Sequence, residues 1–205
     1  MPRIQGVLFD ADGVLQKTPD DWIERVAALA PEPSRKEQFL SELFLAETPC
    51  MRGEEAFEDS LRSVLSKWGS GVPIDSALKV WTLIEPDREI LALVERVRNA
   101  GFKVALATNQ QAYRAHFMSQ SLGYASLFDG LLYSCELGSV KPSADYFAAA
   151  AGRLELAVER LLFIDDSVAN TAAAVSFGMK AEAFCLSEGA ARLATILESH
   201  DVIAA

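Results

Sequence analysis

The stretch Gly6–Leu15 constrains the fold more than any other part of the chain. It reads Gly-Val-Leu-Phe-Asp-Ala-Asp-Gly-Val-Leu, so a short apolar run passes directly into two aspartates that lie two residues apart. A run of this kind is typical of a strand that is buried on both faces. In an extended backbone, Asp10 and Asp12 point to the same side. Two like charges held together are costly unless a cation or a shared proton relieves them, so the pair favours a divalent metal beside a nucleophile or an acid/base.

The spacing of apolar residues divides the chain into two parts. Between residues 16 and 85 they recur at helical spacing and nothing indicates a strand. From residue 86 onward, helical segments alternate with short apolar runs at 103–107, 131–133, 161–164 and, as a candidate edge strand, 181–184. This alternation predicts parallel strands with helices on both faces. The expected fold is therefore α/β, with a Rossmann-like core formed by residues 1–15 and 86–205 and a small α-helical cap, residues 16–85, inserted after the first strand.

Polar residues follow the predicted core strands at their carboxyl ends. They are Asp10 and Asp12 after the first strand, Thr108 and Asn109 after the second, Lys141 beyond the third, and Asp165 and Asp166 after the fourth. Taken singly, each fits an ordinary turn, loop or helix-capping residue. In open parallel sheets, however, ligands bind outside the carboxyl ends of the strands. Because all these residues fall at the same edge, we expect them to form a functional site.

Charge and cysteine content restrict the class of protein. The formal net charge of −10 argues against nucleic acid and against anionic membrane surfaces as partners. It is compatible with an anionic substrate, because a bound cation can reverse the local field. The sequence shows neither a signal-peptide pattern nor an apolar run long enough to span a membrane. Cys50, Cys135 and Cys185 are far apart and fit neither a disulfide framework nor a zinc site, so we expect reduced thiols and a cytoplasmic protein.

Four motifs together resemble those of the haloacid dehalogenase-like (HAD) superfamily of hydrolases. They occur in that family's order and cover the whole chain: D-x-D-G-V at 10–14, Thr108-Asn109, Lys141-Pro142, and a hydrophobic residue followed by two aspartates at 164–166. The insertion between the first and second motifs resembles the subfamily with a small helical cap. The sequence Arg52-Gly53-Glu54, which precedes a helix carrying Phe57, is similar to the cap of sugar-phosphate phosphatases in that group.

The resemblance implies a phosphatase with a carboxylate nucleophile. Asp10 would attack phosphorus and form an aspartyl-phosphate, and Asp12 would be the general acid/base. Thr108 would donate its hydroxyl to a phosphoryl oxygen, helped by backbone N–H groups near Asn109. Lys141 would neutralise the phosphate and keep the nucleophile ionised.

The resemblance also implies Mg²⁺ as the cofactor. The ion would lie between Asp10, Asp12 and the acidic pair, and Asp12 would contribute its main-chain carbonyl. We favour Asp166 as the direct ligand and leave open whether Asp165 is a ligand or orients one. Ser167 and Asn170 are candidates for orienting Lys141 or the acidic pair, and helix capping explains Ser167 equally well.

The leading hypothesis is a Mg²⁺-dependent phosphatase that acts on a small phosphorylated metabolite, with a sugar phosphate as one candidate. A phosphomutase of the β-phosphoglucomutase kind shares the nucleophile and the acid/base and is the main alternative. A 2-haloacid dehalogenase uses an aspartate without metal and generally lacks the second aspartate, so Asp12 argues against it. A non-catalytic binding protein would be expected to have lost a charged motif residue, and none is missing here.

Overall fold

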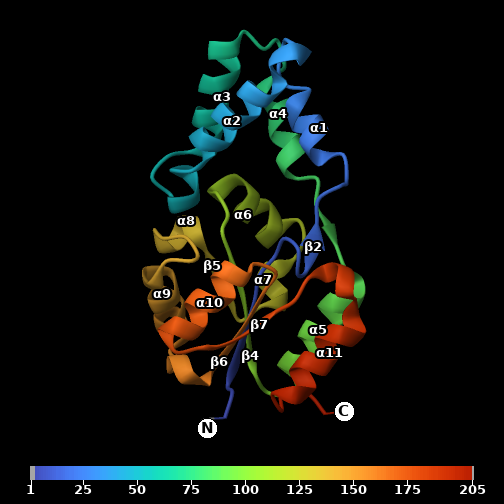
Figure 1. Cartoon of the computed structure of the whole chain (residues 1–205), viewed down its shortest axis with the longest axis vertical. Helices are drawn as coiled ribbons and strands as arrows, with labels where there is room; N and C mark the ends of the chain where they lie inside the picture. The colour runs from blue at the N-terminus through green and yellow to red at the C-terminus, as the bar shows by residue number, and fades with distance from the viewer. Residues whose placement is uncertain (1–2, 205) are drawn as a thin grey trace.

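The computed structural model describes residues 3–204, and its centre is a parallel sheet (Figure 1). The sheet has the strand order β5-β4-β1-β6-β7, and every neighbouring pair is parallel. The strands are β1 (Gly6–Phe9), β4 (Lys103–Thr108), β5 (Gly130–Tyr133), β6 (Leu161–Asp165) and β7 (Lys180–Ala183). The predicted α/β fold with a Rossmann-like parallel sheet is therefore confirmed. The outermost ends of the predicted core, residues 1, 2 and 205, lie outside the described residues.

Helices cover both faces of this sheet because its strands are apolar on both sides. Val7 and Phe9 belong to a hydrophobic cluster with α5 (Arg88–Asn99) and α11 (Ala190–Ser199), whereas Leu8 belongs to a second cluster with α9 (Ala144–Leu154). This division follows from the alternation of side chains along a strand. The core helices are α5 (Arg88–Asn99), α6 (Ala112–Gln120), α7 (Tyr124–Leu127), α8 (Ser134–Leu137), α9 (Ala144–Leu154), α10 (Val168–Phe177) and α11 (Ala190–Ser199), with 3₁₀ turns at Val158–Arg160 and Leu186–Glu188.

Four further helices pack together at the end of the molecule opposite the two termini (Figure 1). They are α1 (Trp22–Ala27), α2 (Lys36–Glu47), α3 (Phe57–Trp68) and α4 (Ile74–Trp81), with 3₁₀ turns η1 (Pro33–Arg35) and η2 (Cys50–Arg52). They share a third hydrophobic cluster, in which Phe39, Leu43, Leu61 and Trp81 are buried. Across residues 3–204, each helix is too short or too polar to cross a membrane.

The prediction that residues 16–85 contain no strand was wrong at both ends of the segment. Gln16–Lys17 (β2) and Glu85–Pro86 (β3) pair as a two-stranded antiparallel sheet. Two residues are too few to show a period of two, and a proline argues against a strand unless it lies at an edge. This small sheet holds the two connections between the four-helix segment and the sheet domain side by side.

The four-helix segment also contacts the core through η2, which packs against α8. Gly53 follows η2 with φ +70°, and a Cβ added there would lie 2.2 Å from the carbonyl oxygen of Cys135 in α8. Glycine is therefore required both by the left-handed backbone and by the close approach of two backbones. On the other side, Tyr113 of α6 packs against the hydrophobic cluster of α1–α4.

Candidate active site

The register of three strands brings the motif residues to one edge of the sheet. Phe9, the last residue of β1, pairs with Leu106 of β4 and with Ile164 of β6, so the carboxyl ends of the three strands lie at the same edge within about one or two residues of each other. The Asp10 amide donates to the Ile164 carbonyl at 2.9 Å, which fixes the first residue after β1 beside the end of β6. The aspartates after β1 and β6 therefore lie next to each other, as the sequence predicts.

Lys141 lies at the centre of this edge, and its side chain is 1% exposed. Its Nζ is 2.9 Å from Asp10 Oδ1 and donates to Asp165 Oδ2 at 2.6 Å and to the Ala107 carbonyl at 2.8 Å. Asn109 holds the Lys141 backbone, because its Oδ1 accepts from the Lys141 amide at 2.8 Å and its Nδ2 donates to the Lys141 carbonyl at 2.9 Å. The lysine is thus fixed at both its backbone and its ammonium group between two buried carboxylates.

Three carboxylates gather around this single ammonium group. Oxygens of Asp10, Asp165 and Asp166 lie within 4.8 Å of one another. Burial raises the pKa of Asp10 to about 6, although Lys141 opposes this effect. Burial and the charge of Asp165 also raise the pKa of Asp166. The cluster therefore carries more negative charge than Lys141 neutralises, and its oxygen-only donor set fits a hard divalent cation such as Mg²⁺.

Asp165 and Asp166 differ in how far the protein engages them. Asp165 is fully buried and accepts hydrogen bonds from Lys141, from the Ser167 amide at 2.8 Å and from Asn170 Nδ2 at 3.0 and 3.1 Å. Ser167 Oγ accepts from the Asn170 amide and caps α10. Of the alternatives for these residues, the Ser167 hydroxyl therefore caps the helix, and the Asn170 side chain holds Asp165. Asp166 is exposed, so its carboxylate is accessible to a ligand.

Gly13 permits Asp166 to approach the first motif. Its φ is +82°, and a Cβ added there would lie 2.3 Å from Asp166 Oδ2. A side chain at position 13 would push this carboxylate away from Asp10. The glycine of the first motif is therefore needed for the shape of the acidic cluster as well as for the turn.

Thr108 is the last residue of β4 and is buried. It pairs with Tyr133 of β5 in the sheet register. It thus lies at the predicted edge of the sheet, and its contact with a phosphoryl oxygen stays a prediction.

Asp12 is bound by side chains that sequence reasoning missed. Arg114 donates from Nη1 to Asp12 Oδ2 at 2.6 Å and from Nη2 to Oδ1 at 2.8 Å. Gln110 Nε2 donates to Oδ2 at 2.7 Å, and Gln16 Nε2 donates to Oδ1 at 2.9 Å. Both Asp12 oxygens therefore accept two hydrogen bonds each. Gln110 lies in the loop between β4 and α6, and Arg114 lies in the first turn of α6. Two polar side chains so soon after a strand that ends at the predicted site were the signal available in the sequence.

A buried acid of the four-helix segment lies close to this cluster. Glu47 is the last residue of α2, and its Oε1 accepts from Trp81 Nε1 at 3.0 Å. Burial raises its pKa to about 7, while the Arg114 charge and the Gln111 amide lower it. Glu47 is thus an acid whose ionised form is disfavoured by the fold.

Replacing Glu47 with glutamine is therefore expected to stabilise the protein at high pH. A raised pKa means that the folded state holds the proton more tightly, so the contribution of Glu47 to stability is fully present below about pH 4.5 and is lost as pH rises through about 7. The difference between the ordinary and the raised pKa of Glu47 corresponds to a loss in the free energy of unfolding on the order of 3 kcal/mol. In denaturant unfolding, the free energy of unfolding of the variant should rise relative to that of the wild type between pH 5 and pH 8. A difference that does not vary with pH would contradict the assignment.

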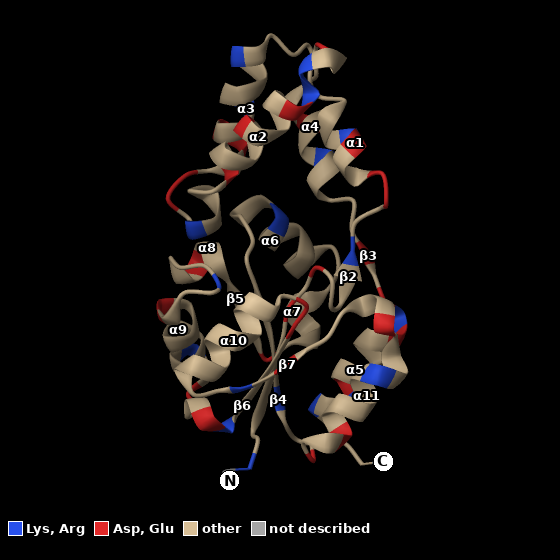
Figure 2. Ribbon diagram, in the orientation of Figure 1, with Lys and Arg blue, Asp and Glu red and all other residues tan. Residues whose placement is uncertain are grey.

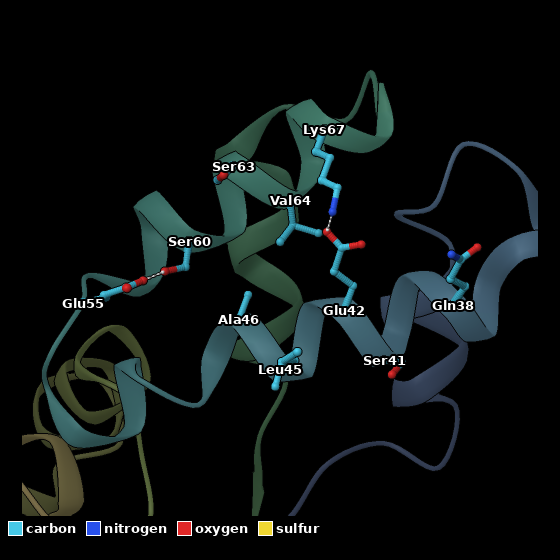
Figure 3. A pocket seen from close by; sticks show the side chains of 10 residues that line it. All are labelled: Gln38, Ser41, Glu42, Leu45, Ala46, Glu55, Ser60, Ser63, Val64 and Lys67. Atoms are coloured by element: carbon cyan, nitrogen blue, oxygen red, sulfur yellow. Dashed lines mark hydrogen bonds and ion pairs between the residues drawn. The ribbon is translucent and has the colours of Figure 1, made fainter.

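A separate cleft of about 810 Å³ lies between α2 and α3 (Figure 3). The Lys67–Glu42 ion pair, at 2.6 Å, spans it, and Leu45 and Val64 line it. None of the carboxylates around Lys141 lines this cleft. Figure 2 shows basic residues scattered among acidic ones over both parts of the molecule. The candidate active site is therefore the edge of the sheet and not this cleft.

Comparison with known proteins gives a family match over most of the chain. Residues 4–178 match the family model described as haloacid dehalogenase-like hydrolase. Over 96 residues the chain is 26% identical to the sesquiterpene phosphatase astK of Aspergillus oryzae, an alignment that covers 47% of this chain and 49% of that protein. The chain spans about half or less of the length of the curated relatives it matches.

Two solved structures illustrate the likeness in fold. A predicted HAD-like family hydrolase from Porphyromonas gingivalis superposes with a TM-score of 0.80 at 22% identity, over 96% of this chain and 98% of that one. A HAD family enzyme from Bacteroides thetaiotaomicron, in complex with magnesium and inorganic phosphate, gives 0.78 at 20% identity, over 93% and 98%. At these identities the likeness shows a shared fold.

Proposed function

Because the chain belongs to the haloacid dehalogenase-like hydrolase family, we propose that it is a Mg²⁺-dependent phosphatase acting on a small phosphorylated metabolite. The observation that carries the proposal is the convergence of Asp10, Lys141, Asp165 and Asp166 at one edge of the sheet. It is supported by a relative named as a phosphatase and by a structural neighbour that holds magnesium and phosphate.

In this proposal Asp10 is the nucleophile. Its Oδ1 accepts from the Ala11 amide at 2.7 Å and lies 2.9 Å from Lys141 Nζ, which holds the carboxyl group in one orientation. A carboxylate oxygen attacks phosphorus, the bond to the leaving alcohol breaks, and an aspartyl-phosphate forms. Lys141 keeps Asp10 ionised and offsets the charge of the phosphoryl group.

Asp12 serves as the general acid/base in both steps. It gives a proton to the leaving oxygen and then takes one from the water that attacks the aspartyl-phosphate. The Thr108 hydroxyl and backbone N–H groups near Asn109 bind the phosphoryl oxygens. The Asn109 side chain contributes indirectly, because it holds the Lys141 backbone in place.

Asp10, Asp166 and the main-chain carbonyl of Asp12 would hold Mg²⁺. When bound, the ion supplies positive charge that reduces repulsion between the carboxylates and the phosphate. Asp165 orients Lys141 and completes the negative charge of the cluster, since its oxygens already accept from Lys141, Ser167 and Asn170.

The proposal includes a division into a core domain, residues 1–15 and 86–205, and a cap domain, residues 16–85. The separate hydrophobic cluster of α1–α4 and the paired connections β2 and β3 support it. The cap domain would cover the phosphate site and select the leaving group, and a sugar phosphate is one candidate substrate.

The test is release of orthophosphate from a panel of phosphorylated metabolites, with and without Mg²⁺. We expect chelation to lower the rate at least about a hundredfold and added Mg²⁺ to restore it, because the ion contributes several kcal/mol of charge stabilisation. Undiminished turnover after exhaustive chelation would rule out the metal scheme. Isomerisation of a sugar phosphate without net orthophosphate would instead identify a phosphomutase.

A further inference from the structure

Helix α6 lies between the helices of the proposed cap domain and the strands of the sheet (Figure 1). Two adjacent residues link it to the two sides: Tyr113 packs against the cap cluster, and Arg114 binds Asp12. The Arg114 side chain is 11% exposed and the Asp12 side chain 38%, so the arginine is shielded from solvent while the carboxylate stays partly open to the site. A movement of the cap relative to α6 therefore acts close to the proposed acid/base.

The geometry around Asp12 is not one in which it can exchange a proton. Each of its oxygens accepts two hydrogen bonds, from Arg114 together with Gln16 or Gln110. A carboxylate oxygen that accepts from two donors has no lone pair left for a third proton. To act on the leaving group or on water, Asp12 must give up at least one of these contacts.

Two unused donors lie at the interface with the cap. Arg114 Nε and Gln111 Nε2 are buried and donate to no acceptor among the described residues. Buried donors of this kind normally have a partner, so these two call for one. The nearby acid is Glu47 of the cap: it is buried and accepts from Trp81, which belongs to the hydrophobic cluster that Tyr113 of α6 contacts. Burial has the larger effect on the pKa of Glu47 and raises it, while the charge of Arg114 lowers it.

We propose that Glu47 and Arg114 are positioning residues that form a latch on Asp12, and that movement of the cap releases it. In the latched state Arg114 binds both oxygens of Asp12. In the released state Glu47 accepts from Gln111 and Arg114, and an oxygen of Asp12 turns toward Asp10. Arginine suits this role because its planar group can donate to two carboxylates along different edges. The latch rests on the proposed phosphatase function, in which Asp12 is the acid/base.

A double-mutant cycle tests whether Glu47 acts through Arg114. The variants are Glu47→Gln, Arg114→Gln and both together, with Glu42→Gln as the matched control. Glu42 also lies on α2 and accepts from a tryptophan, Trp68 Nε1 at 3.2 Å, but its ion pair is with Lys67 of the cap. Glutamine at position 47 keeps an oxygen that can accept from Trp81.

Steady-state kinetics would use phenyl phosphate and p-nitrophenyl phosphate at saturating Mg²⁺. These probes are alike in shape, but the phenolate leaving group needs a proton far more than p-nitrophenolate does. We expect Glu47→Gln to lower kcat for phenyl phosphate about tenfold with KM nearly unchanged, and to affect p-nitrophenyl phosphate less. In the Arg114→Gln background, Glu47→Gln should cause no further loss, because no latch remains to be released. Glu42→Gln should match the wild type.

If Glu47→Gln lowers kcat by the same factor in the wild-type and the Arg114→Gln backgrounds, the latch is overturned. It is also overturned if Glu47→Gln lowers kcat by the same factor for phenyl phosphate and for p-nitrophenyl phosphate. If Arg114→Gln does not fold, as judged by circular dichroism, Arg114→Lys takes its place, since lysine cannot bridge two carboxylates with a planar group. Wild-type protein that releases no orthophosphate from either probe or from the metabolite panel would overturn both the proposed function and the latch. If the wild type releases orthophosphate but Glu47→Gln and Arg114→Gln lower kcat independently of each other, the latch is overturned and the proposed function stands.

Discussion

Replacing Asp10 with asparagine is expected to reduce orthophosphate release at least about a thousandfold, because the amide cannot attack phosphorus. Asparagine has nearly the same shape, and its oxygen can still accept from the Ala11 amide. Lys141 keeps Asp165 as a partner at 2.6 Å, so the ammonium group is not left unpaired. The substitution therefore removes the nucleophile while it preserves the packing around it.

The measurement is single-turnover release of orthophosphate together with denaturant unfolding. Asp20→Asn is the matched control, because the Asp20 side chain is 98% exposed and lies outside the site. The control should retain wild-type turnover, and both variants should unfold at denaturant concentrations close to that of the wild type. Near wild-type turnover in Asp10→Asn would refute the nucleophile assignment.

The largest loss of stability is expected from Lys141→Met. The side chain is buried, and its removal would leave the carboxylates of Asp10 and Asp165 together without a cation. Removing one partner of a buried ion pair typically costs about 3–5 kcal/mol. Since burial already raises the pKa of Asp10 to about 6, the loss should be smaller at pH 5, where this carboxyl is protonated, than at pH 8.

Chemical unfolding of Lys141→Met at the two pH values checks this expectation. Lys67→Met is the control, because that lysine is exposed and its ion pair with Glu42 lies at the surface of the cap helices. An exposed pair of this kind contributes about 1 kcal/mol or less. Equal stability of Lys141→Met and the wild type at pH 8 would show that the lysine does not neutralise the cluster.

The positions of the charged motif residues could be predicted because they depend on local rules. Short apolar runs identify the strands, and parallel strands place their carboxyl ends at one edge. Asp10, Lys141 and Asp165 follow from these two rules, and the structure brings their charged groups into direct contact. Asn109 was predicted only through its backbone, and its side chain turned out to hold the Lys141 main chain.

The partners of Asp12 could not be predicted by the same means. Arg114 lies on a helix, where an arginine is ordinarily a solvated surface residue. Whether it reaches Asp12 depends on how α6 sits relative to the loop after β1, which no local pattern encodes. Gln16 presents the same difficulty, because it becomes buried only when its two-residue strand pairs with Pro86, seventy residues further along the chain.

Direct trapping of the acyl phosphate tests the central claim most sharply. The enzyme would be mixed with Mg²⁺ and excess substrate, quenched in acid, and treated with borohydride, which reduces an aspartyl-phosphate to homoserine. Peptide mass spectrometry should then find homoserine at position 10, only when substrate and Mg²⁺ are both present. Unmodified Asp10 during active turnover, or homoserine at Asp12, Asp165 or Asp166 instead, would contradict the account.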